Sequence, residues 1–308
     1  MDQPLTSGAR EAPLRTGAYE IDVLVHGYPG KAVCHGGLGW STIALLRGSG
    51  RVALVDVGSF GQRQLVVDGL ARHGLSPDDV TDVLLTHSHW DHSVNWVMFP
   101  NARVVIGAEE LAWSVAEPWG TTPVPELYVR ELDRSPRTLR VRAGQEVLPG
   151  LVCDDAPGHT PGHLIFMLSG GDRDVIFTGD AAKNRAEILS LTADMTYDPA
   201  ASRRSMEHIW EIWRRRPGSV LIPGHDMPMV LVAGAPRYLR AQAAAISASS
   251  GTRWMRRGFL SLRRRPACPL PHRSGRHLDS FGDVQRSSLP RRRRDHVTIA
   301  DRRGAGVV

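Results

Sequence analysis

The chain has 308 residues, of which 42% are hydrophobic and 6% aromatic, and it carries a formal net charge of +6. This composition excludes collagen-like, coiled-coil and wholly disordered proteins and is typical of a globular chain with one large domain or two small ones. The positive charge is concentrated in residues 251–308, which contain 15 Arg and 4 Asp, so the first 250 residues have a net charge of −5 and lack the basic character of a nucleic-acid-binding domain.

Short apolar runs that are rich in β-branched residues and bounded by Gly, Pro or Asp predict nine strands. They span residues 20–26, 41–46, 51–57, 80–86, 102–106, 151–155, 163–168, 174–178 and 219–222. Two helices are also predicted, one over residues 62–73 and one that begins after Asp198 with Pro199 at its first position. Strands that occur in runs broken by helices favour stacked sheets with the helices outside.

The helix after Asp198 has a pronounced apolar face. Its large apolar residues follow one another at intervals of three and four, namely Met206, Ile209, Trp210 and Trp213. This spacing places them on one side of a helix, so we expect both tryptophans in the core rather than in a ligand site.

We divide the chain into three regions. Residues 1–18 are an N-terminal extension, residues 19–250 form the folded domain, and residues 251–308 are an Arg-rich tail. The tail mixes Arg, Pro, Ser and Gly without sustained periodicity, so we expect it to be disordered. We interpret it as a solvated extension; the alternative is an electrostatic arm that binds nucleic acid or another anionic surface.

The cysteine content and the apolar runs bear on the compartment. The three cysteines are scattered and form no Cys-x-x-Cys pair, which fits a reducing environment. No apolar run approaches the roughly 18 residues of a membrane span, and the N-terminal residues do not resemble a signal peptide. We therefore expect a cytoplasmic protein with no membrane partner. The sequence contains no signal for the oligomeric state.

A dense cluster of histidines follows the predicted strand at residues 80–86. The segment reads Thr-His-Ser-His-Trp-Asp-His over residues 86–92. If the strand continues to residue 89, His87 and His89 point to the same side, and the next turn brings Asp91 and His92 beside them. Neutral imidazoles with a carboxylate are the ligands expected for zinc or a similar ion, and an open coordination position is typical of a catalytic site.

Four further polar residues lie beside apolar strands. His159 lies in a Gly/Pro-rich loop between two predicted strands, and Asp56, Asp180 and His225 each follow an apolar run. Loops at strand ends collect functional groups in layered sheet domains, so we expect these side chains to join the histidine cluster.

The motifs HSHWDH, GHTPGH, FTGD and PGHD, in that order, resemble those of the metallo-β-lactamase superfamily over about residues 20–235. This resemblance implies an α+β fold, the four-layer αββα sandwich, with a binuclear metal site at one edge of its two sheets. The ligands that it implies are His87, His89 and His159 for the first metal, Asp91, His92 and His225 for the second, and Asp180 as the bridge. Asp56 matches a residue that supports the ligands from behind, and His163 matches a structural histidine.

The resemblance also implies the cofactor and the chemistry. We expect two divalent ions per chain, most simply Zn²⁺, with Fe or Mn as alternatives. Two ions about 3.5–4 Å apart share a water and lower its pKa, which gives a hydroxide nucleophile. Asp91 and Asp180 are the candidate catalytic groups that would carry the proton to the leaving group.

Asp180 occupies the position where zinc β-lactamases commonly have cysteine, so we do not predict β-lactam hydrolysis. The pattern is more similar to glyoxalase II and the acyl-homoserine lactonases, with a weaker similarity to the metallo-β-lactamase domain-containing protein 1 group. We predict hydrolysis of an ester, lactone or thioester in a small molecule. The alternatives are a phosphodiesterase or ribonuclease of the same fold, with nucleic acid held by the basic tail, and a non-catalytic metal-binding protein.

Aromatic residues near the motifs are candidates for a substrate-binding wall. Trp90 lies inside the ligand motif, and a proline-rich stretch carries Trp113, Trp119 and Tyr128. Packing of these rings against the core is the alternative. Lys183, one of two lysines in the chain, is a candidate for an anionic group of the substrate or for a surface salt bridge.

Overall fold

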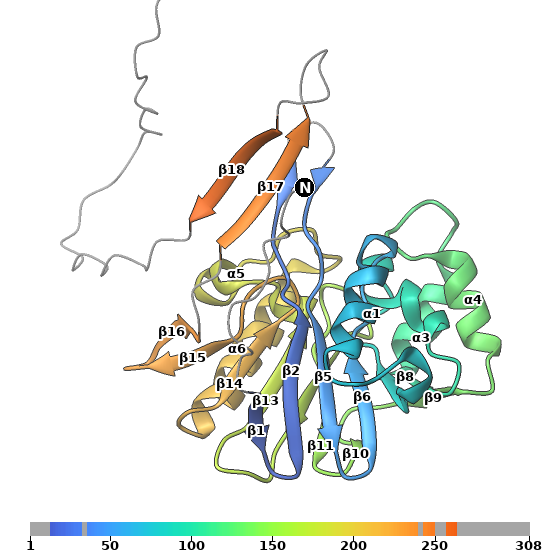
Figure 1. Cartoon of the computed structure of the whole chain (residues 1–308), viewed down its shortest axis with the longest axis horizontal. Helices are drawn as coiled ribbons and strands as arrows, with labels where there is room; N and C mark the ends of the chain where they lie inside the picture. Colours follow the sequence, from blue (N-terminus) through green and yellow to red (C-terminus); the bar gives the residue numbers. More distant parts are fainter. Residues whose placement is uncertain (1–12, 33–35, 240–242, 250–256, 264–308) are drawn as a thin grey trace, which may run out of the picture. The chain divides into compact units, whose positions relative to one another are not determined.

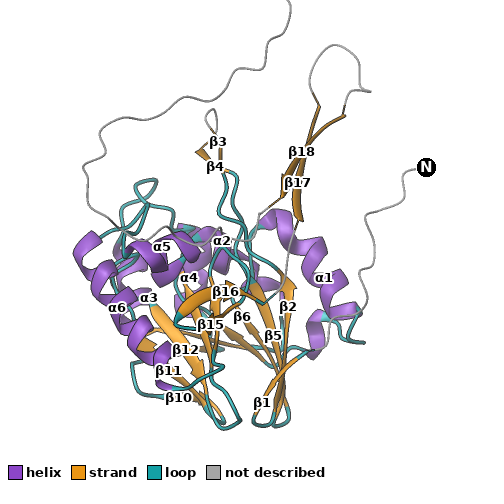
Figure 2. Ribbon diagram, turned by 90° about the vertical axis from the view of Figure 1, so that its left-hand side faces the viewer, coloured by secondary structure: helices purple, strands orange, loops and turns teal. Residues whose placement is uncertain are grey.

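The computed structural model describes residues 13–32, 36–239, 243–249 and 257–263. Figure 1 shows these residues in sequence colours, and Figure 2 shows the same structure turned by 90°. No helix among the described residues is long and apolar enough to cross a membrane.

The first sheet has seven strands in the order β1-β2-β5-β6-β7-β8-β9. Neighbouring strands from β1 to β6 are antiparallel, and those from β6 to β9 are parallel. The strands are β1 Leu14–Thr16, β2 Tyr19–Val25, β5 Ile43–Gly48, β6 Arg51–Val55, β7 Asp82–Leu84, β8 Arg103–Gly107 and β9 Thr138–Val141.

The second sheet also has seven strands, in the order β10-β11-β12-β13-β14-β15-β16. Only β13 and β14 run parallel within it. The strands are β10 Glu146–Leu148, β11 Leu151–Asp155, β12 Leu164–Leu168, β13 Val175–Gly179, β14 Val220–Pro223, β15 Met229–Val232 and β16 Ala235–Tyr238.

Six helices accompany the sheets within the described residues. They are α1 Arg63–Ala71, α2 Trp90–Ser93, α3 Ala108–Ala116, α4 Glu126–Arg134, α5 Arg185–Ser190 and α6 Pro199–Arg215. Short 3-10 turns occur at Phe60–Gln62, Pro77–Asp79, Val94–Met98 and Asp180–Ala182.

Three apolar clusters hold these elements together as four layers. The central cluster packs side chains of the first sheet, such as Leu46, against side chains of the second, such as Phe166. A second cluster joins the first sheet to α1, α3 and α4, and a third joins the second sheet to α5 and α6. Figure 2 shows α1 and α6 on opposite outer sides of the two sheets. The predicted αββα sandwich is therefore confirmed.

All nine predicted strands are present, with ends displaced by three residues or fewer. The predicted helix at residues 62–73 is α1, and the helix after Asp198 is α6. Helices α2, α3, α4 and α5 and the outer strands β1, β9, β10, β15 and β16 were not predicted from the sequence. These elements are short, and their apolar residues do not form long periodic runs.

Helix α6 forms for the reasons that its sequence indicates. The Asp198 side chain accepts hydrogen bonds from the backbone N–H groups of Ala200 and Ala201, which caps the helix, and Pro199 occupies its first turn. Met206 and Trp213 are fully buried in the cluster against the second sheet. Trp210 is half-buried and packs at the margin of that cluster, where it donates a hydrogen bond to the Ile188 carbonyl. Both tryptophans thus have the predicted packing role.

Two small antiparallel pairs complete the described structure. They are β3 Lys31–Ala32 with β4 Gly36–Gly37, and β17 Ala243–Ser249 with β18 Arg257–Arg263. Strand β1 lies within the predicted N-terminal extension, and β18 lies within the predicted tail. Residues 264–308, the remainder of that tail, lie outside the described residues.

Candidate metal centre

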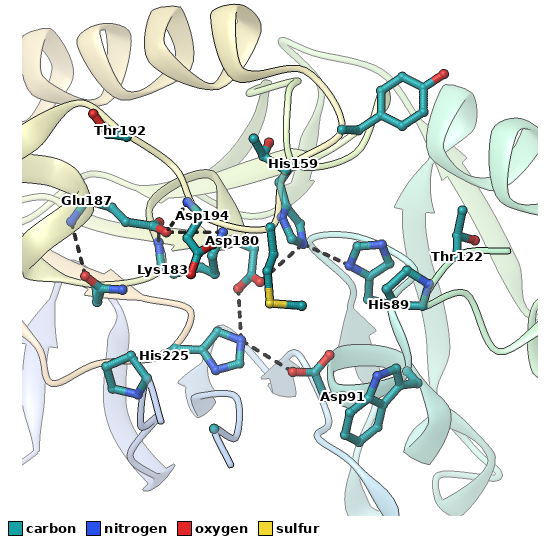
Figure 3. Close-up of a pocket in the computed structure, with 18 of the residues that line it drawn as sticks. His89, Asp91, Thr122, His159, Asp180, Lys183, Glu187, Thr192, Asp194 and His225 are labelled. Atoms are coloured by element: carbon teal, nitrogen blue, oxygen red, sulfur yellow. Dashed lines mark hydrogen bonds and ion pairs between the residues drawn. The ribbon is translucent and has the colours of Figure 1, made fainter. Parts of the chain in front are cut away.

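The seven predicted ligands come from loops that meet at one edge of the two sheets. His87 and its neighbours follow β7, Asp180 follows β13, His225 follows β14, and His159 lies between β11 and β12. Their donor atoms form three groups within 4.8 Å: His87, His89 and His159; His87, His92 and Asp180; and Asp91, His92 and His225. Figure 3 shows His89, Asp91, His159, Asp180 and His225 converging on one space.

The backbone around His87 is not the continued strand from which the sequence prediction placed His87 and His89 on the same side. Strand β7 ends at Leu84, so His87 and His89 lie in an extended loop that leads into the short helix α2. Ser93 holds this loop closed, because its Oγ donates hydrogen bonds to the carbonyls of Ser88 and His89 at 2.9 Å each. The two imidazoles still lie together, with ring centroids 4.7 Å apart. The predicted proximity is present, but a loop produces it.

Asp180 stands between His159 on one side and His92 and His225 on the other. One carboxylate oxygen, Oδ2, lies 3.2 Å from His159 Nε2. The other, Oδ1, lies 3.2 Å from His92 Nε2 and 3.3 Å from His225 Nε2. Each oxygen therefore faces a different set of ligands, as a bridging carboxylate requires.

Buried nitrogen atoms test whether this arrangement fits a metal ion. His87 is fully buried, and its Nε2 has no hydrogen-bond partner. His159 Nε2 lies 2.9 Å from His89 Nδ1, and His92 Nε2 lies 3.2 Å from His225 Nε2. Buried polar atoms are nearly always paired, so an unpaired imidazole nitrogen beside other inward-facing nitrogens fits a cation that accepts their lone pairs.

Burial keeps the first group of histidines neutral. It lowers the pKa of His87 and of His159 well below the ordinary value, and neighbouring imidazoles add to the effect at His87. Burial also lowers the pKa of His89 to about 4, against the opposing carboxylates. A neutral imidazole is the form that binds a metal, so these side chains are prepared for coordination near neutral pH.

The pKa values of His92 and His225 shift in the opposite direction, because carboxylates surround these two histidines. Burial alone would lower the pKa of His92, but Asp180, Asp91 and Asp56 outweigh it and raise that pKa well above the ordinary value. The pKa of His225 is also raised, because the charge of Asp180 and a hydrogen bond to it exceed the effect of burial. The carboxylates thus favour positive charge at this position, whether a proton or a metal ion supplies it.

Asp56 lies behind the ligands, where the sequence analysis placed it. Its Oδ2 is 2.7 Å from His92 Nδ1, which directs the other ring nitrogen towards Asp180. Its Oδ1 accepts a hydrogen bond from the Thr86 backbone N–H at 2.9 Å. Asp56 has a positive φ of 53°, an uncommon conformation for a residue other than glycine.

His163 and two glycines fix the position of Asp180. His163 Nε2 accepts a hydrogen bond from the Asp180 backbone N–H at 3.0 Å, in keeping with a structural role. A Cβ at Gly179 would lie 2.5 Å from Thr86 Oγ1, and one at Gly224 would lie 2.3 Å from Asp180 Oδ1. A side chain at Gly224 would clash with the Asp180 carboxylate, and one at Gly179 would clash with Thr86 and His163 beside it.

A pocket of about 840 Å³ opens onto the ligands. Trp90, Trp113 and Lys183, three of the candidates from the sequence, line it. Trp119 and Tyr128 are not among the lining residues; the Arg130 guanidinium stacks on Trp119, and the Tyr128 ring packs against Phe60. The structure therefore does not bring Trp119 to the pocket.

The sequence analysis missed part of the pocket wall. Met195 and Tyr197 line the pocket, although the turn that carries them had no assigned role. The Tyr197 ring lies 6.0 Å from Trp113, which in turn lies 6.4 Å from His89. No sequence motif marks this turn. Its position directly before the Asp198 cap of α6 was the one feature that could have drawn attention to it. The Asp198 N–H donates a hydrogen bond to the Gly158 carbonyl, so the turn lies against the loop that carries His159.

Lys183 lines the pocket, and its side chain is nearly buried. Its Nζ lies 3.4 Å from Glu187 Oε1, and its carbonyl accepts a hydrogen bond from the His225 backbone N–H at 2.8 Å. The surface salt bridge considered from the sequence is thus replaced by a buried ion pair beside the ligands.

The sequence model of the metallo-β-lactamase superfamily matches residues 36–225, which include all seven proposed ligands. The chain belongs to the metallo-β-lactamase superfamily. Metallo-β-lactamase domain-containing protein 1 of Rattus norvegicus is 29% identical over 191 residues, which are 58% of this chain and 63% of the rat protein. An N-acyl homoserine lactonase of Bacillus thuringiensis is 24% identical over 53% of this chain and 62% of its own length. This superfamily member thus spans less than two thirds of the length of these relatives.

Solved structures of the superfamily share the fold. AidC, described as a dizinc quorum-quenching lactonase in complex with a product, superposes with a TM-score of 0.57 and 16% identity, over 74% of this chain and 96% of AidC. A structure of AiiA from Bacillus thuringiensis gives a TM-score of 0.55 and 18% identity, over 69% of this chain and 94% of that one.

Proposed function

We propose that the protein is a metal-dependent hydrolase that cleaves an ester, lactone or thioester bond in a small molecule. The observation that carries this proposal is the position of Asp180, whose two oxygens face two separate sets of buried ligands. Relatives described as N-acyl homoserine lactonases support hydrolysis at a carbonyl carbon.

The ligand sets suit two divalent ions. We assign the first ion to His87, His89 and His159, the second to Asp91, His92 and His225, and the bridge to Asp180. Nitrogen donors with carboxylate oxygens suit Zn²⁺, and Fe or Mn would accept the same donors.

The side chains around the ions would control orientation and proton transfer. When bound, two divalent ions would supply an activated water and polarise the substrate carbonyl. Asp91 lines the pocket, and its Oδ2 is 3.4 Å from His225 Nε2, so its carboxylate lies where it could take a proton from the attacking water and pass it to the leaving group. Asp180 would keep the two ligand sets in register, and Asp56 would hold the His92 ring in one orientation.

The pocket wall favours a substrate with an apolar portion. Trp90, Trp113, Met195 and Tyr197 form an aromatic and apolar surface beside the ligands. Lys183 also lines the pocket and would meet a carboxylate or similar anion of the substrate. The carboxylates of Asp91, Glu187 and Asp194 also line the pocket, which disfavours the polyanionic backbone of a nucleic acid.

A panel of activated substrates tests the proposal. Protein of known metal content should hydrolyse lactones, thioesters or aryl esters at least about 10-fold faster than a bis-aryl phosphodiester, since the site would be matched to a carbonyl. A clear phosphodiester preference would favour the phosphodiesterase alternative. Metal binding without turnover of any activated substrate would favour the non-catalytic alternative.

A further inference from the structure

Glu110 is a fully buried carboxylate close to the metal ligands but outside the proposed ligand set. It lies in the first turn of α3, which follows β8 directly. Burying a carboxylate is costly unless donors surround it, so its presence here needs an explanation in its contacts.

The contacts of Glu110 join two loops that carry ligands. Its Oε1 accepts hydrogen bonds from the Ser88 backbone N–H at 2.8 Å and from Ser88 Oγ at 2.7 Å. Its Oε2 accepts one from the Gly162 backbone N–H at 3.2 Å. Ser88 lies between His87 and His89 and follows a strand of the first sheet; Gly162 lies three residues after His159, in a loop of the second sheet.

The backbones at this junction are in close contact, with no room for a side chain between them. A Cβ at Gly162 would lie 2.1 Å from the backbone nitrogen of Glu110, and a Cβ at Gly107 would lie 2.8 Å from the Gly162 carbonyl oxygen. The start of α3 and the loop at Gly162 are thus in backbone contact. The imidazoles that the two loops carry face each other, with His89 Nδ1 and His159 Nε2 2.9 Å apart.

From these contacts we infer that Glu110 is a positioning residue that sets the separation of His89 from His159 and thereby the affinity of the first ion site. An apolar side chain of the same size would fill the space but could accept none of the three hydrogen bonds. The second ion site takes its ligands from α2 and from the loop after β14, which Glu110 does not contact in the hydrogen bonds described above. The inference rests on the proposed metal sites but not on the reaction.

Glu110→Gln is the informative variant because it keeps the shape of the side chain. The amide oxygen can still accept both hydrogen bonds from Ser88, but the NH₂ group then faces the N–H of Gly162. Two donors in contact should push the loops apart at His159 while the rest of the fold is kept.

The experiment measures the affinity for Zn²⁺ at each site separately, by competition with a chromophoric chelator and without any substrate. Glu110→Gln is introduced into two parents: His225→Ala, which retains the first site, and His159→Ala, which retains the second. In the His225→Ala parent we expect Glu110→Gln to lower the affinity for Zn²⁺ about 10- to 100-fold, the range typical of the removal of partners of metal ligands. In the His159→Ala parent we expect a loss of less than about threefold.

Asp82→Asn is the matched control. Asp82 is also a fully buried carboxylate, paired with Arg103 Nη2 at 2.6 Å, but it lies at the start of β7, opposite the end that leads to the ligands. It should lower the melting temperature without a change in either affinity.

Equal losses in the two parents, or no loss in either, would overturn the inference, and so would a His225→Ala parent that binds no Zn²⁺. If Glu110→Gln does not fold, Ser88→Ala decides instead. It removes one of the three hydrogen bonds, so a smaller loss confined to the first site is expected, and an unchanged first site would contradict the role of Glu110.

Discussion

The metal centre and the pocket wall beside it differ in how firmly the chain holds them. His87 is fully buried, and Asp56, Glu110 and His163 fix its neighbours through hydrogen bonds. Met195 and Tyr197, on the wall, are each 65% exposed. A buried polar group must be paired and so tolerates few residue types, whereas an exposed apolar group tolerates many. We therefore expect the buried residues of the candidate metal centre to determine the chemistry, and the exposed residues of the pocket wall to determine the choice of substrate.

The largest effect is expected from the centre, in Asp180→Asn. This change keeps the shape of the side chain but removes the charge that faces both ligand sets. We expect weaker binding of at least one ion and a fall in kcat of about 100-fold or more on carbonyl substrates. Metal analysis and steady-state kinetics measure both effects. Asp172→Asn is the control, because Asp172 is exposed and precedes β13, whereas Asp180 follows the other end of that strand. An unchanged rate in Asp180→Asn would contradict the bridging role.

The centre should also control how stability depends on pH in metal-free protein. Burial lowers the folded-state pKa of His87 and His159, and lowers that of His89 to about 4 and that of His163 to about 3. As the pH falls below about 6.5, the unfolded chain takes up protons that these four histidines cannot, so stability is lost on acidification.

His92 and His225 work in the opposite direction. Their raised pKa values add stability that is present below about 6.5 and lost as the pH rises through the folded-state values. Because the contribution of His92 and His225 changes little below pH 6.5, the four lowered values predict a net decrease in the melting temperature of chelator-treated protein between pH 6.5 and pH 4. Thermal unfolding across this range measures it, with His208→Gln as a control outside the centre. A melting temperature that is constant or rises on acidification would contradict the prediction.

The same contrast explains which features the sequence predicts. Residues 86–92 carry four of the proposed ligands at fixed spacing, so the clustering of these side chains was predictable, although a loop and α2 rather than a continued strand bring His87 and His89 together. Long buried strands and the capped helix α6 were predictable for a similar reason, since burial imposes periodicity.

Features fixed by tertiary packing escaped prediction. Glu110 is one of two adjacent glutamates in a helix that was not predicted, and only the approach of Ser88 and Gly162 gives it a distinct role. The wall residue Tyr197 is distant in sequence from every ligand, and it reaches the pocket because the turn before α6 lies against the loop that carries His159.

A moderate effect is expected on the wall, in Tyr197→Ala. The ring lines the pocket and contacts Trp113, but it touches no proposed ligand in the interactions described. Its loss should raise KM about 3- to 10-fold for substrates with an apolar chain and leave kcat nearly unchanged, because it removes binding shared by the substrate and the transition state. Kinetics with a short and a long acyl substrate measure this, and a large fall in kcat with constant KM would assign Tyr197 to the chemistry instead.

The smallest effect is expected from Trp119→Ala, which separates the pocket wall from the surface around it. Trp119 and Trp113 belong to the same proline-rich stretch, and both were candidates from the sequence. Trp113 lines the pocket near His89, whereas Trp119 is 56% exposed and stacks against Arg130. An exposed cation–π contact contributes only about 0.5–1 kcal/mol, so the variant should fold normally and keep KM within about twofold. Trp113→Ala, tested in parallel with the same long-chain substrate, should raise KM several-fold. Equal increases in KM for the two variants would mean that the substrate extends beyond the pocket to Trp119. The substrate-binding wall would then have to include Trp119, which stacks against Arg130 of α4.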